Sequence, residues 1–342
     1  MSFRLSTLLA CVVSLSLSLL PLDAEAASAS SQKRTSVKSG KARVVKVSSK
    51  SRKQVRKPVK RVKLSYKRQK AGYKRVMAYQ PQLANPINGL ALYSSSALVV
   101  NAVSGERIFE KNSQVVAPIA SITKLMTSIV VLDMHLPLHE PITITEDDVD
   151  TLKNSSSRLM VGTTLTRGEM LHLALMASEN RAAHALARTA PGGLDAFIAR
   201  MNRTAISLGM QRSHFVDPTG LNSANVSTAE DLIRLVQSAH HYPEIRSLST
   251  SEAYSFYSNV NGRPYEFRNT NPLVKSENWQ IGISKTGYIS EAGKCLVMHA
   301  TINDTPVVIV LLDSAGKLTR IGDANRIKRW LETSPNAILR AG

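Results

Sequence analysis

The spacing of apolar residues predicts a helix that begins directly after Pro118. Apolar side chains recur every three or four residues from Ile119 to Met134, which is the period of a helix and not of a strand. Within this pattern Ser121 and Lys124 stand three residues apart, so a helix would place both side chains on one face, one turn apart. The sequence therefore predicts a hydroxyl and an amine side by side at the start of a buried helix.

Helical patterns continue as far as residue 240. A capping box at Thr166 and Glu169 opens an apolar helix that stops at Ser178. A short strand is expected at Pro141–Thr145, and further helices are expected over residues 182–190, 194–208 and 228–240. We expect these segments to form a helical subdomain.

Strand patterns occur on both sides of this helical region. Residues 97–100 and 107–109 flank a turn at Ser104-Gly105 and predict a β-hairpin. Beyond Pro243 the pattern predicts strands over residues 253–257, 265–269, 280–289, 295–302 and 306–312. Short turns join several of them, so the sheet should be largely antiparallel, and an amphipathic helix over 318–333 would cover it. The expected fold class is α+β.

The first 85 residues lack the apolar pattern of a folded domain. Residues 1–26 have the features of a secretory signal, with Arg4 in a basic start, an apolar and serine-rich run, and a small-residue cleavage site at Ala24-Glu25-Ala26. An uncleaved anchor is the alternative. Residues 27–85 are rich in Ser, Lys and Arg and cannot bury enough apolar surface to order themselves. We therefore expect one folded domain over residues 86–342.

The positive charge of the chain belongs to this basic tail and not to the domain. Nineteen of the 44 Lys and Arg residues lie between Lys33 and Arg75, a stretch without Asp or Glu, and the rest of the chain holds 25 basic and 25 acidic residues. Behind an export signal the available polyanions are envelope polymers and the anionic membrane surface. The tail either binds these or is a linker without a specific partner, and nucleic acid is not expected.

Cysteine and histidine provide no sign of a disulfide or a metal site. Cys11 lies in the predicted signal, which leaves Cys295 alone on an apolar strand, where a buried structural thiol is expected. His135 and His139 are four residues apart, but Pro137 between them would break the helix that could pair them on a metal. We expect no metal and no cofactor.

Two further short motifs accompany Ser121 and Lys124. Ser178-Glu179-Asn180 follows a predicted helix, and Lys285-Thr286-Gly287 lies in the predicted strand 280–289. The Ser-x-x-Lys spacing alone is uninformative, because it also occurs at Ser30/Lys33 and Ser314/Lys317. The three motifs in this order are the informative feature.

This ordered set resembles the signature of the penicillin-binding proteins and serine β-lactamases. The chain is most similar to the low-molecular-mass penicillin-binding proteins that act as D-alanyl-D-alanine peptidases. The resemblance covers roughly Ser94 to Thr333. Within this range it includes, besides the three motifs, the segments Asp217–Leu221 and Ala292–Leu296. It implies an antiparallel sheet covered by terminal helices, a helical subdomain, and an active site between them.

The chemistry of such a site needs a neutral lysine. A serine hydroxyl attacks an amide only if a base takes its proton, and Lys124 can do so only after its pKa has fallen well below about 10.4. Burial and a neighbouring cation would lower it, and Lys285 is the candidate cation. We expect Lys124 to be the amine that loses its proton. The N–H of Ser121, at the helix start, could face the developing oxyanion.

The resemblance implies roles for two residues of the second motif. Ser178 would relay a proton to the leaving amine, and Asn180 would hold the substrate amide and Lys124. Between them, Glu179 is expected to be a turn residue that points to solvent. Asp217-Pro218-Thr219-Gly220 is expected to be a structural turn, since Pro and Gly stand at turn positions.

The resemblance also implies roles for the third motif. Lys285 and Thr286 would bind the substrate carboxylate that lies α to the scissile amide. Gly287 completes the motif, and the N–H of the following residue, Tyr288, would be the second oxyanion donor.

The implied protein is a periplasmic serine peptidase that forms an acyl-enzyme on Ser121 and cleaves D-alanyl bonds in peptidoglycan, with β-lactams as covalent inhibitors. The chain ends shortly after Thr333 without a second β-rich domain. This short form resembles endopeptidases that cut D-Ala-diaminopimelate cross-links, and a D-alanyl-D-alanine carboxypeptidase is the alternative. A β-lactamase is disfavoured, because no convincing Glu-x-x-x-Asn segment follows Asn180. A non-catalytic wall-binding protein is the remaining alternative.

Overall fold

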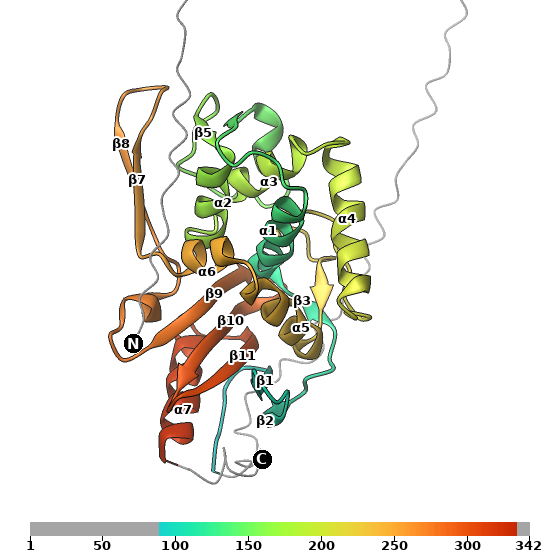
Figure 1. Ribbon diagram of the computed structural model, residues 1–342, viewed down its shortest axis with the longest axis vertical. Coiled ribbons are helices and arrows are strands. Elements are labelled where there is room, and N and C mark those ends of the chain that lie inside the picture. Colours follow the sequence, from blue (N-terminus) through green and yellow to red (C-terminus); the bar gives the residue numbers. More distant parts are fainter. Residues whose placement is uncertain (1–88, 334–342) are drawn as a thin grey trace, which may run out of the picture. The chain divides into compact units, whose positions relative to one another are not determined.

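A five-stranded antiparallel sheet in the order β2-β1-β11-β10-β9 organises the described part of the chain (Figure 1). The computed structural model describes residues 89–333, so the predicted signal, the basic tail and the last nine residues lie outside it. The strands are β1 (Ser96–Asn101), β2 (Arg107–Lys111), β9 (Gln280–Ile289), β10 (Gly293–Ile302) and β11 (Thr305–Ser314). The predicted antiparallel sheet is confirmed, and β9 lies at its edge.

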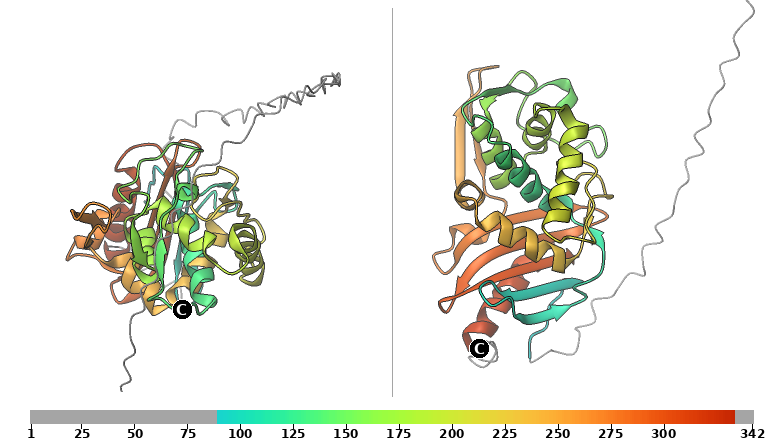
Figure 2. Two further views of the ribbon diagram at one scale, coloured as in Figure 1. Left: turned by 90° about the horizontal axis from the view of Figure 1, so that it is seen from above. Right: turned by 45° about the vertical axis from the view of Figure 1, so that its right-hand side comes forward.

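Helices cover both faces of this sheet (Figures 1 and 2). Along each strand, alternate side chains point to opposite faces. On one face Leu296, Ile309 and Leu311 pack with Ile327 and other residues of α7 (Thr319–Thr333). On the opposite face Val297, Val308 and Val310 belong to the core that includes α5 (Ala229–His240). The covering helix predicted over 318–333 is confirmed.

The helical subdomain packs around α1 (Thr123–Asp133). The remaining helices there are α2 (Arg167–Met176), α3 (Asn180–Arg188) and α4 (Gly193–Ser207). The helix predicted after Pro118 is confirmed, although its first turn, η1 (Ala120–Ile122), is a 3₁₀ helix. The predicted capping box at Thr166 is also present, because the Thr166 hydroxyl accepts the N–H of Glu169.

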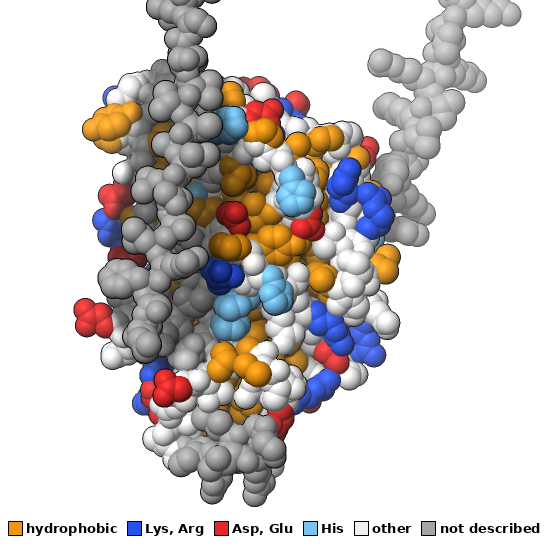
Figure 3. All heavy atoms as spheres, viewed as in Figure 1, with side chains coloured by type: hydrophobic (Ala, Val, Ile, Leu, Met, Phe, Trp, Pro, Cys, Tyr) orange, Lys and Arg blue, Asp and Glu red, His pale blue; other side chains and the backbone are white. Residues whose placement is uncertain are grey.

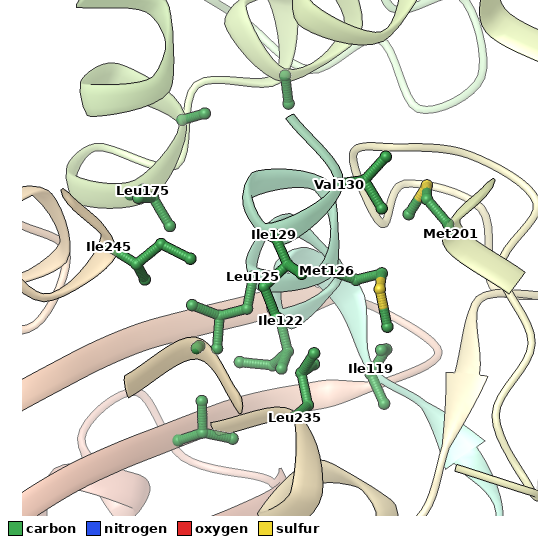
Figure 4. Close-up of a cluster of buried hydrophobic side chains, with 14 of the residues drawn as sticks. Ile119, Ile122, Leu125, Met126, Ile129, Val130, Leu175, Met201, Leu235 and Ile245 are labelled. Atoms are coloured by element: carbon green, nitrogen blue, oxygen red, sulfur yellow. The ribbon is translucent and has the colours of Figure 1, made fainter. Parts of the chain in front are cut away.

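The central position of α1 is visible in the packing of its apolar side chains (Figure 4). Six residues of the segment, all at most 2% exposed, point into the core: Ile119, Ile122, Leu125, Met126, Ile129 and Val130. They pack among side chains from four other helices, namely Leu175 of α2, Met201 of α4, Leu235 of α5 and Ile245 of α6 (Pro243–Thr250). This packing fixes the position of Ser121 and Lys124, which lie on the same segment.

The sequence pattern did not predict α6, which begins at Pro243, where the strand region was expected to start. Proline is favourable in the first turn of a helix, where its missing N–H costs no hydrogen bond. Only Ile245 and Ser249 of α6 are buried, four residues apart, so the segment is too short to show a clear helical period.

The predicted strands at 253–257 and 265–269 exist but do not join the main sheet. They form a separate two-stranded hairpin of β7 (Ala253–Tyr257) and β8 (Pro264–Arg268). Its aromatic side chains stack on one another, with the Phe256 ring 6.0 Å from Phe267 and 5.9 Å from Tyr265. The sequence pattern predicted these two strands, but it did not predict which strands they pair with.

Short elements complete the described region. Two further antiparallel pairs are β3 (Ala117–Pro118) with β6 (Val226–Ser227) and β4 (Pro141–Thr143) with β5 (Thr164–Thr166), and the 3₁₀ helices are η2 (Glu146–Asp148) and η3 (Pro272–Lys275). The predicted burial of Cys295 is confirmed, and burial raises the pKa of its thiol to about 11. Within residues 89–333 no helix has the length and hydrophobicity needed to cross a membrane.

The surface of the described region carries charges of both signs. Acidic and basic side chains are interspersed on the face shown in Figure 3, with basic side chains gathered over α4. Arg200 and Arg203 of that helix are exposed. This mixture agrees with the expectation that the domain, in contrast to the basic tail, has no strong net charge.

Candidate active site

The hydroxyl of Ser121 and the amine of Lys124 are in direct contact. Ser121 lies in η1 and Lys124 in the first turn of α1, and the distance from Nζ to Oγ is 2.9 Å. Ser121 is partly exposed, whereas the Lys124 side chain is fully buried. The helical spacing in the sequence therefore predicted this pair correctly, and the hydroxyl is open to a substrate from one side.

The other contacts of Lys124 leave its amine ready to accept a proton. Nζ donates to the Asn180 side-chain oxygen at 2.8 Å and to the Thr219 carbonyl oxygen at 2.7 Å. A neutral amine has two N–H groups and one lone pair, and these two acceptors use both N–H groups. The lone pair then points toward the Ser121 hydroxyl, which is the geometry of a general base.

Burial lowers the pKa of Lys124 to about 7, although the carboxylates of Asp217 and Glu179 oppose the shift. Burial also lowers the pKa of Lys285, with further contributions from Lys124 and Arg320. The expected direction for Lys124 is thus present, but burial is its main cause and not the charge of Lys285. The structure does not single out Lys124 as the only amine that loses its proton.

Lys285 approaches the site from β9 and contacts the second motif. Its Nζ donates to the Ser178 hydroxyl at 2.9 Å, and its side chain is 1% exposed. Ser178 follows α2 in the left-handed backbone region, with φ of 62°, which is unusual for a residue with a side chain. Beside Lys285, the Thr286 hydroxyl donates to the hydroxyl of Thr270 at 2.7 Å. The structure therefore brings all three motifs together.

Two glycines allow three backbone segments to meet at Ser121. A Cβ on Gly287 would lie 2.9 Å from the Ile119 carbonyl oxygen and 3.1 Å from the Ser121 nitrogen. A Cβ on Gly220 would lie only 1.9 Å from the Ala120 carbonyl oxygen. Ala120 itself has φ of 48°, so the backbone before the nucleophile is held in an uncommon conformation. The N–H of Ser121 consequently lies beside β9, next to the residue that precedes Tyr288.

We predict that Gly220→Ala destabilises the domain more than Gly105→Ala. Both glycines have positive φ, +82° and +74°, so alanine carries a similar backbone cost of about 1–2 kcal/mol at either position. Gly105 has no neighbouring atom within 4 Å of an added Cβ, whereas Gly220 would clash with Ala120. The additional cost at Gly220 should be at least roughly 2 kcal/mol. Urea unfolding of both variants measures the difference, and equal destabilisation would refute the close contact.

The Tyr288 side chain lies at the rim of the site. It is 58% exposed, and the Lys294 ammonium lies 3.8 Å from the centre of its ring. The N–H of Tyr288 comes directly after Gly287, on the edge strand β9. This position is compatible with the expected role as an oxyanion donor, which stays a prediction.

The expectation that Glu179 points to solvent is wrong. Its carboxylate accepts a hydrogen bond from the Ser157 hydroxyl at 2.6 Å, and burial raises its pKa above the ordinary value. The neighbouring Asn180 donates to the Ser155 hydroxyl at 3.0 Å. The second motif therefore also anchors the loop that contains Ser155 and Ser157, a contact between segments that local sequence could not show.

The turn at Asp217-Pro218-Thr219-Gly220 contributes more than chain reversal. The Asp217 carboxylate accepts the N–H groups of Thr219 and Gly220 at 2.6 and 2.7 Å, as expected for a structural turn. The turn also directs the Thr219 carbonyl toward Lys124, which the sequence reasoning missed.

Arg320 is a further charged residue that sequence reasoning missed. It lies in the first turn of α7, and its guanidinium donates to the Gly287 carbonyl oxygen at 3.2 Å. Its charge helps to lower the pKa of Lys285. No motif marks this arginine in the sequence, because α7 reaches the active site only through the packing of the sheet.

The comparisons with known proteins agree with this geometry. Residues 81–316 match the model of a peptidase family described as D-alanyl-D-alanine carboxypeptidase. The chain is 47% identical over 242 residues to a D-alanyl-D-alanine endopeptidase of Pseudomonas aeruginosa, which covers 71% of this chain and 78% of that protein. It is 45% identical over 257 residues to a D-alanyl-D-alanine endopeptidase of Escherichia coli K12, covering 75% of this chain and 80% of that protein.

A solved structure has the same fold. The crystal structure of the Streptomyces K15 DD-transpeptidase superimposes with a TM-score of 0.65 at 29% sequence identity. The match covers 70% of this chain and 97% of that one. The chain therefore shares the arrangement of sheet, covering helices and helical subdomain with this DD-transpeptidase, as the resemblance of the three motifs implied.

Proposed function

The chain belongs to the D-alanyl-D-alanine carboxypeptidase family, and we propose that its own main reaction is hydrolysis of D-Ala-diaminopimelate cross-links in peptidoglycan. It is a serine-type DD-peptidase that acts on peptidoglycan peptides. The endopeptidase assignment is supported by two relatives of that name, each nearly half identical to this chain. Removal of a terminal D-alanine is the alternative reaction, since the family model bears that name.

Acylation starts at Ser121. Neutral Lys124 takes the hydroxyl proton while Oγ attacks the carbonyl carbon of the D-alanine, which forms a tetrahedral oxyanion. The N–H groups of Ser121 and Tyr288 stabilise this negative charge. The single observation that carries the proposal is the arrangement of the Lys124 amine, whose two N–H groups have other acceptors and whose remaining position faces Ser121.

Substrate binding determines which of the two buried lysines, Lys124 or Lys285, carries the positive charge. Both carboxypeptidase and endopeptidase substrates carry a carboxylate α to the scissile amide. We propose that Lys285 and Thr286 bind this carboxylate. The Arg320 guanidinium lies nearby, where it donates to the Gly287 carbonyl oxygen. A bound anion favours the charged form of Lys285, and a charged Lys285 disfavours a second charge on Lys124. The substrate thereby helps to keep the base neutral.

Release of the leaving amine needs a proton. Ser178 lies within hydrogen-bond distance of Lys285 and can relay to the leaving nitrogen the proton that Lys124 took from Ser121, so that Lys124 is neutral again when the amide bond has broken. The product is an ester between Ser121 and the D-alanyl carbonyl. Water then hydrolyses this ester, which regenerates the Ser121 hydroxyl and releases the shortened peptide. β-Lactams acylate the same serine.

We propose a periplasmic location on the basis of the secretory signal predicted at residues 1–26. The basic residues between 27 and 85 would then face the cell wall and the membrane surface, and anionic envelope polymers are their proposed partners. Both segments lie outside the described residues.

Purified cross-linked muropeptide dimers test the proposed reaction. We expect the protein to convert dimers into monomers without an equivalent release of free D-alanine, as followed by liquid chromatography and mass spectrometry. Release of free D-alanine from uncleaved dimers would instead establish the carboxypeptidase reaction. Pentapeptide monomers serve as the matched substrate, because they carry the terminal D-Ala-D-Ala bond and no cross-link.

We also predict that acylation accelerates as the pH rises through about 7, the value to which burial lowers the pKa of Lys124. Below this pH the amine is protonated and cannot accept the Ser121 proton, so the rate should fall about tenfold for each further pH unit. The second-order rate constant for acylation by benzylpenicillin, measured from about pH 5 to 9, tests this. A rate independent of pH over that range would contradict the assignment of Lys124 as the base.

A further inference from the structure

A short loop before β5 is held rigidly by one aspartate. The Asp150 carboxylate accepts the N–H groups of Leu152 and Lys153 at 2.8 and 3.0 Å through one oxygen, and that of Ser155 at 2.8 Å through the other. These hydrogen bonds outweigh burial and hold the pKa of Asp150 below its ordinary value. These hydrogen bonds therefore fix the backbone position from which the Lys153 side chain extends.

The same loop is attached to the catalytic motif. Ser155 accepts a hydrogen bond from Asn180, and Ser157 donates one to Glu179, at 3.0 and 2.6 Å. Because Asn180 also accepts a hydrogen bond from Lys124, only two hydrogen bonds separate the loop from the proposed base. The loop thus forms part of the wall of the active site.

Lys153 connects this loop to the turn that follows β9. Its ammonium contacts the Glu291 carboxylate at 2.5 Å, and the two side chains are 28% and 41% exposed. The hydrogen bond from Lys153 holds the pKa of Glu291 below its ordinary value, and Ser290 donates to the second carboxylate oxygen at 2.8 Å. An exposed ion pair of this kind contributes little to stability, so a ligand can open it at small cost.

The position of this pair follows the direction of the bound peptide. On β9, the site proposed for the carboxylate of the leaving amino acid is at Lys285 and Thr286, and the proposed oxyanion donor is at Tyr288. The acyl part of the substrate must therefore extend in the remaining direction, toward the end of the strand. Glu291 lies three residues beyond Tyr288, in the turn to β10.

We propose that Lys153 and Glu291 form the subsite for the side chain of the residue that precedes the D-alanine, and that they select a side chain carrying both an amine and a carboxylate. This inference rests on the proposed function. Such a side chain replaces the internal ion pair with two new ones, its carboxylate on Lys153 and its amine on Glu291. A side chain with only one of these charges would leave one partner of the opened pair without a counterion.

Penicillins that differ only in the acyl side chain test this selection. The D-α-aminoadipyl side chain ends in an amine and a carboxylate, whereas the adipyl side chain lacks the amine. We expect the native protein to be acylated about tenfold faster by the aminoadipyl penicillin, as one charge-assisted hydrogen bond would provide. In Glu291→Gln the ratio of the two rate constants should approach one, because the amine loses its partner. In Lys153→Met both rate constants should fall and the preference should remain, because both side chains carry the carboxylate. The ratio cancels any effect common to both penicillins.

The control is another exposed ion pair. Arg268 and Glu266 on β8 contact at 2.9 Å and are 66% and 54% exposed, and Arg268→Met should keep the native ratio. A native ratio near one, or a ratio unchanged in the Glu291 variant, would overturn the proposed subsite. If neither penicillin acylated the native protein, the proposed function would fail, and this inference with it. The two failures are therefore distinguishable.

Discussion

Ser121→Ala is expected to abolish covalent labelling by penicillin and to reduce cleavage of cross-linked muropeptides by about a million-fold. Within residues 89–333, the Ser121 hydroxyl is the only side-chain hydroxyl that the structure places in contact with the Lys124 amine. Alanine removes the nucleophile and leaves nothing that can form the ester. Fluorescent penicillin followed by denaturing electrophoresis measures the label, and chromatography of muropeptides measures the cleavage.

Ser128→Ala is the matched control for this change. Ser128 lies on the same helix, is fully buried, and donates its hydroxyl to the Lys124 carbonyl oxygen at 2.7 Å. This hydrogen bond is to the backbone of Lys124 and not to its amine, so the variant should retain labelling. Equal labelling of Ser121→Ala and the native protein would refute the assignment of the nucleophile.

Lys124→Arg is expected to slow acylation by about 10³–10⁴-fold, even though the positive charge is retained. A guanidinium does not lose its proton in proteins and therefore cannot act as a base. Lys124→Met should lose a similar amount, because it removes the amine without replacing it. Stopped-flow measurement of acylation by benzylpenicillin gives the rate constants for both variants.

Lys285→Arg provides the comparison that separates a base from a binding charge. If Lys285 binds the substrate carboxylate, arginine can still supply that interaction, so this variant should lose far less activity than Lys124→Arg. Substantial acylation by Lys124→Arg would show that the amine at position 124 is not the base. Circular dichroism of each variant checks that the buried substitutions leave the fold intact.

Local pattern predicted most of the elements, because each is amphipathic or uniformly apolar over its own length. The strands at 253–257 and 280–289 were predicted with the bounds that the structure has. The helix α6 was missed, since only Ile245 and Ser249 of it are buried. The separation of β7 and β8 from the main sheet was also missed, because pairing partners depend on the packing of distant segments.

The same distinction applies to the site. Ser121 and Lys124 could be paired from the sequence, since a helix fixes the distance between residues three apart. The contacts of Lys124 with Thr219 and Asn180 depend on segments 95 and 56 residues away, so the sequence around Lys124 could not predict them. Arg320 reaches the Gly287 carbonyl from the far end of the chain in the same way.

The pKa of Lys124 shows a quantity whose direction could be predicted from the sequence but whose main cause could not. The sequence suggested both burial and the charge of Lys285 as causes, and burial is the larger one because α1 lies in the centre of the core. The relative size of the effects of burial and charge on this pKa depends on how deeply the helix is buried, which the periodicity of one segment does not determine. Glu179 was misjudged for the same reason, because its partner Ser157 is 22 residues away.

A crystal structure of the protein after reaction with benzylpenicillin would test the proposed mechanism most directly. We expect an ester bond on Oγ of Ser121, with the ester carbonyl oxygen about 2.7–3.1 Å from the backbone nitrogens of Ser121 and Tyr288. The penicillin carboxylate should lie against Lys285 and Thr286. An adduct on another residue, or an ester whose carbonyl oxygen points away from both nitrogens, would contradict the account.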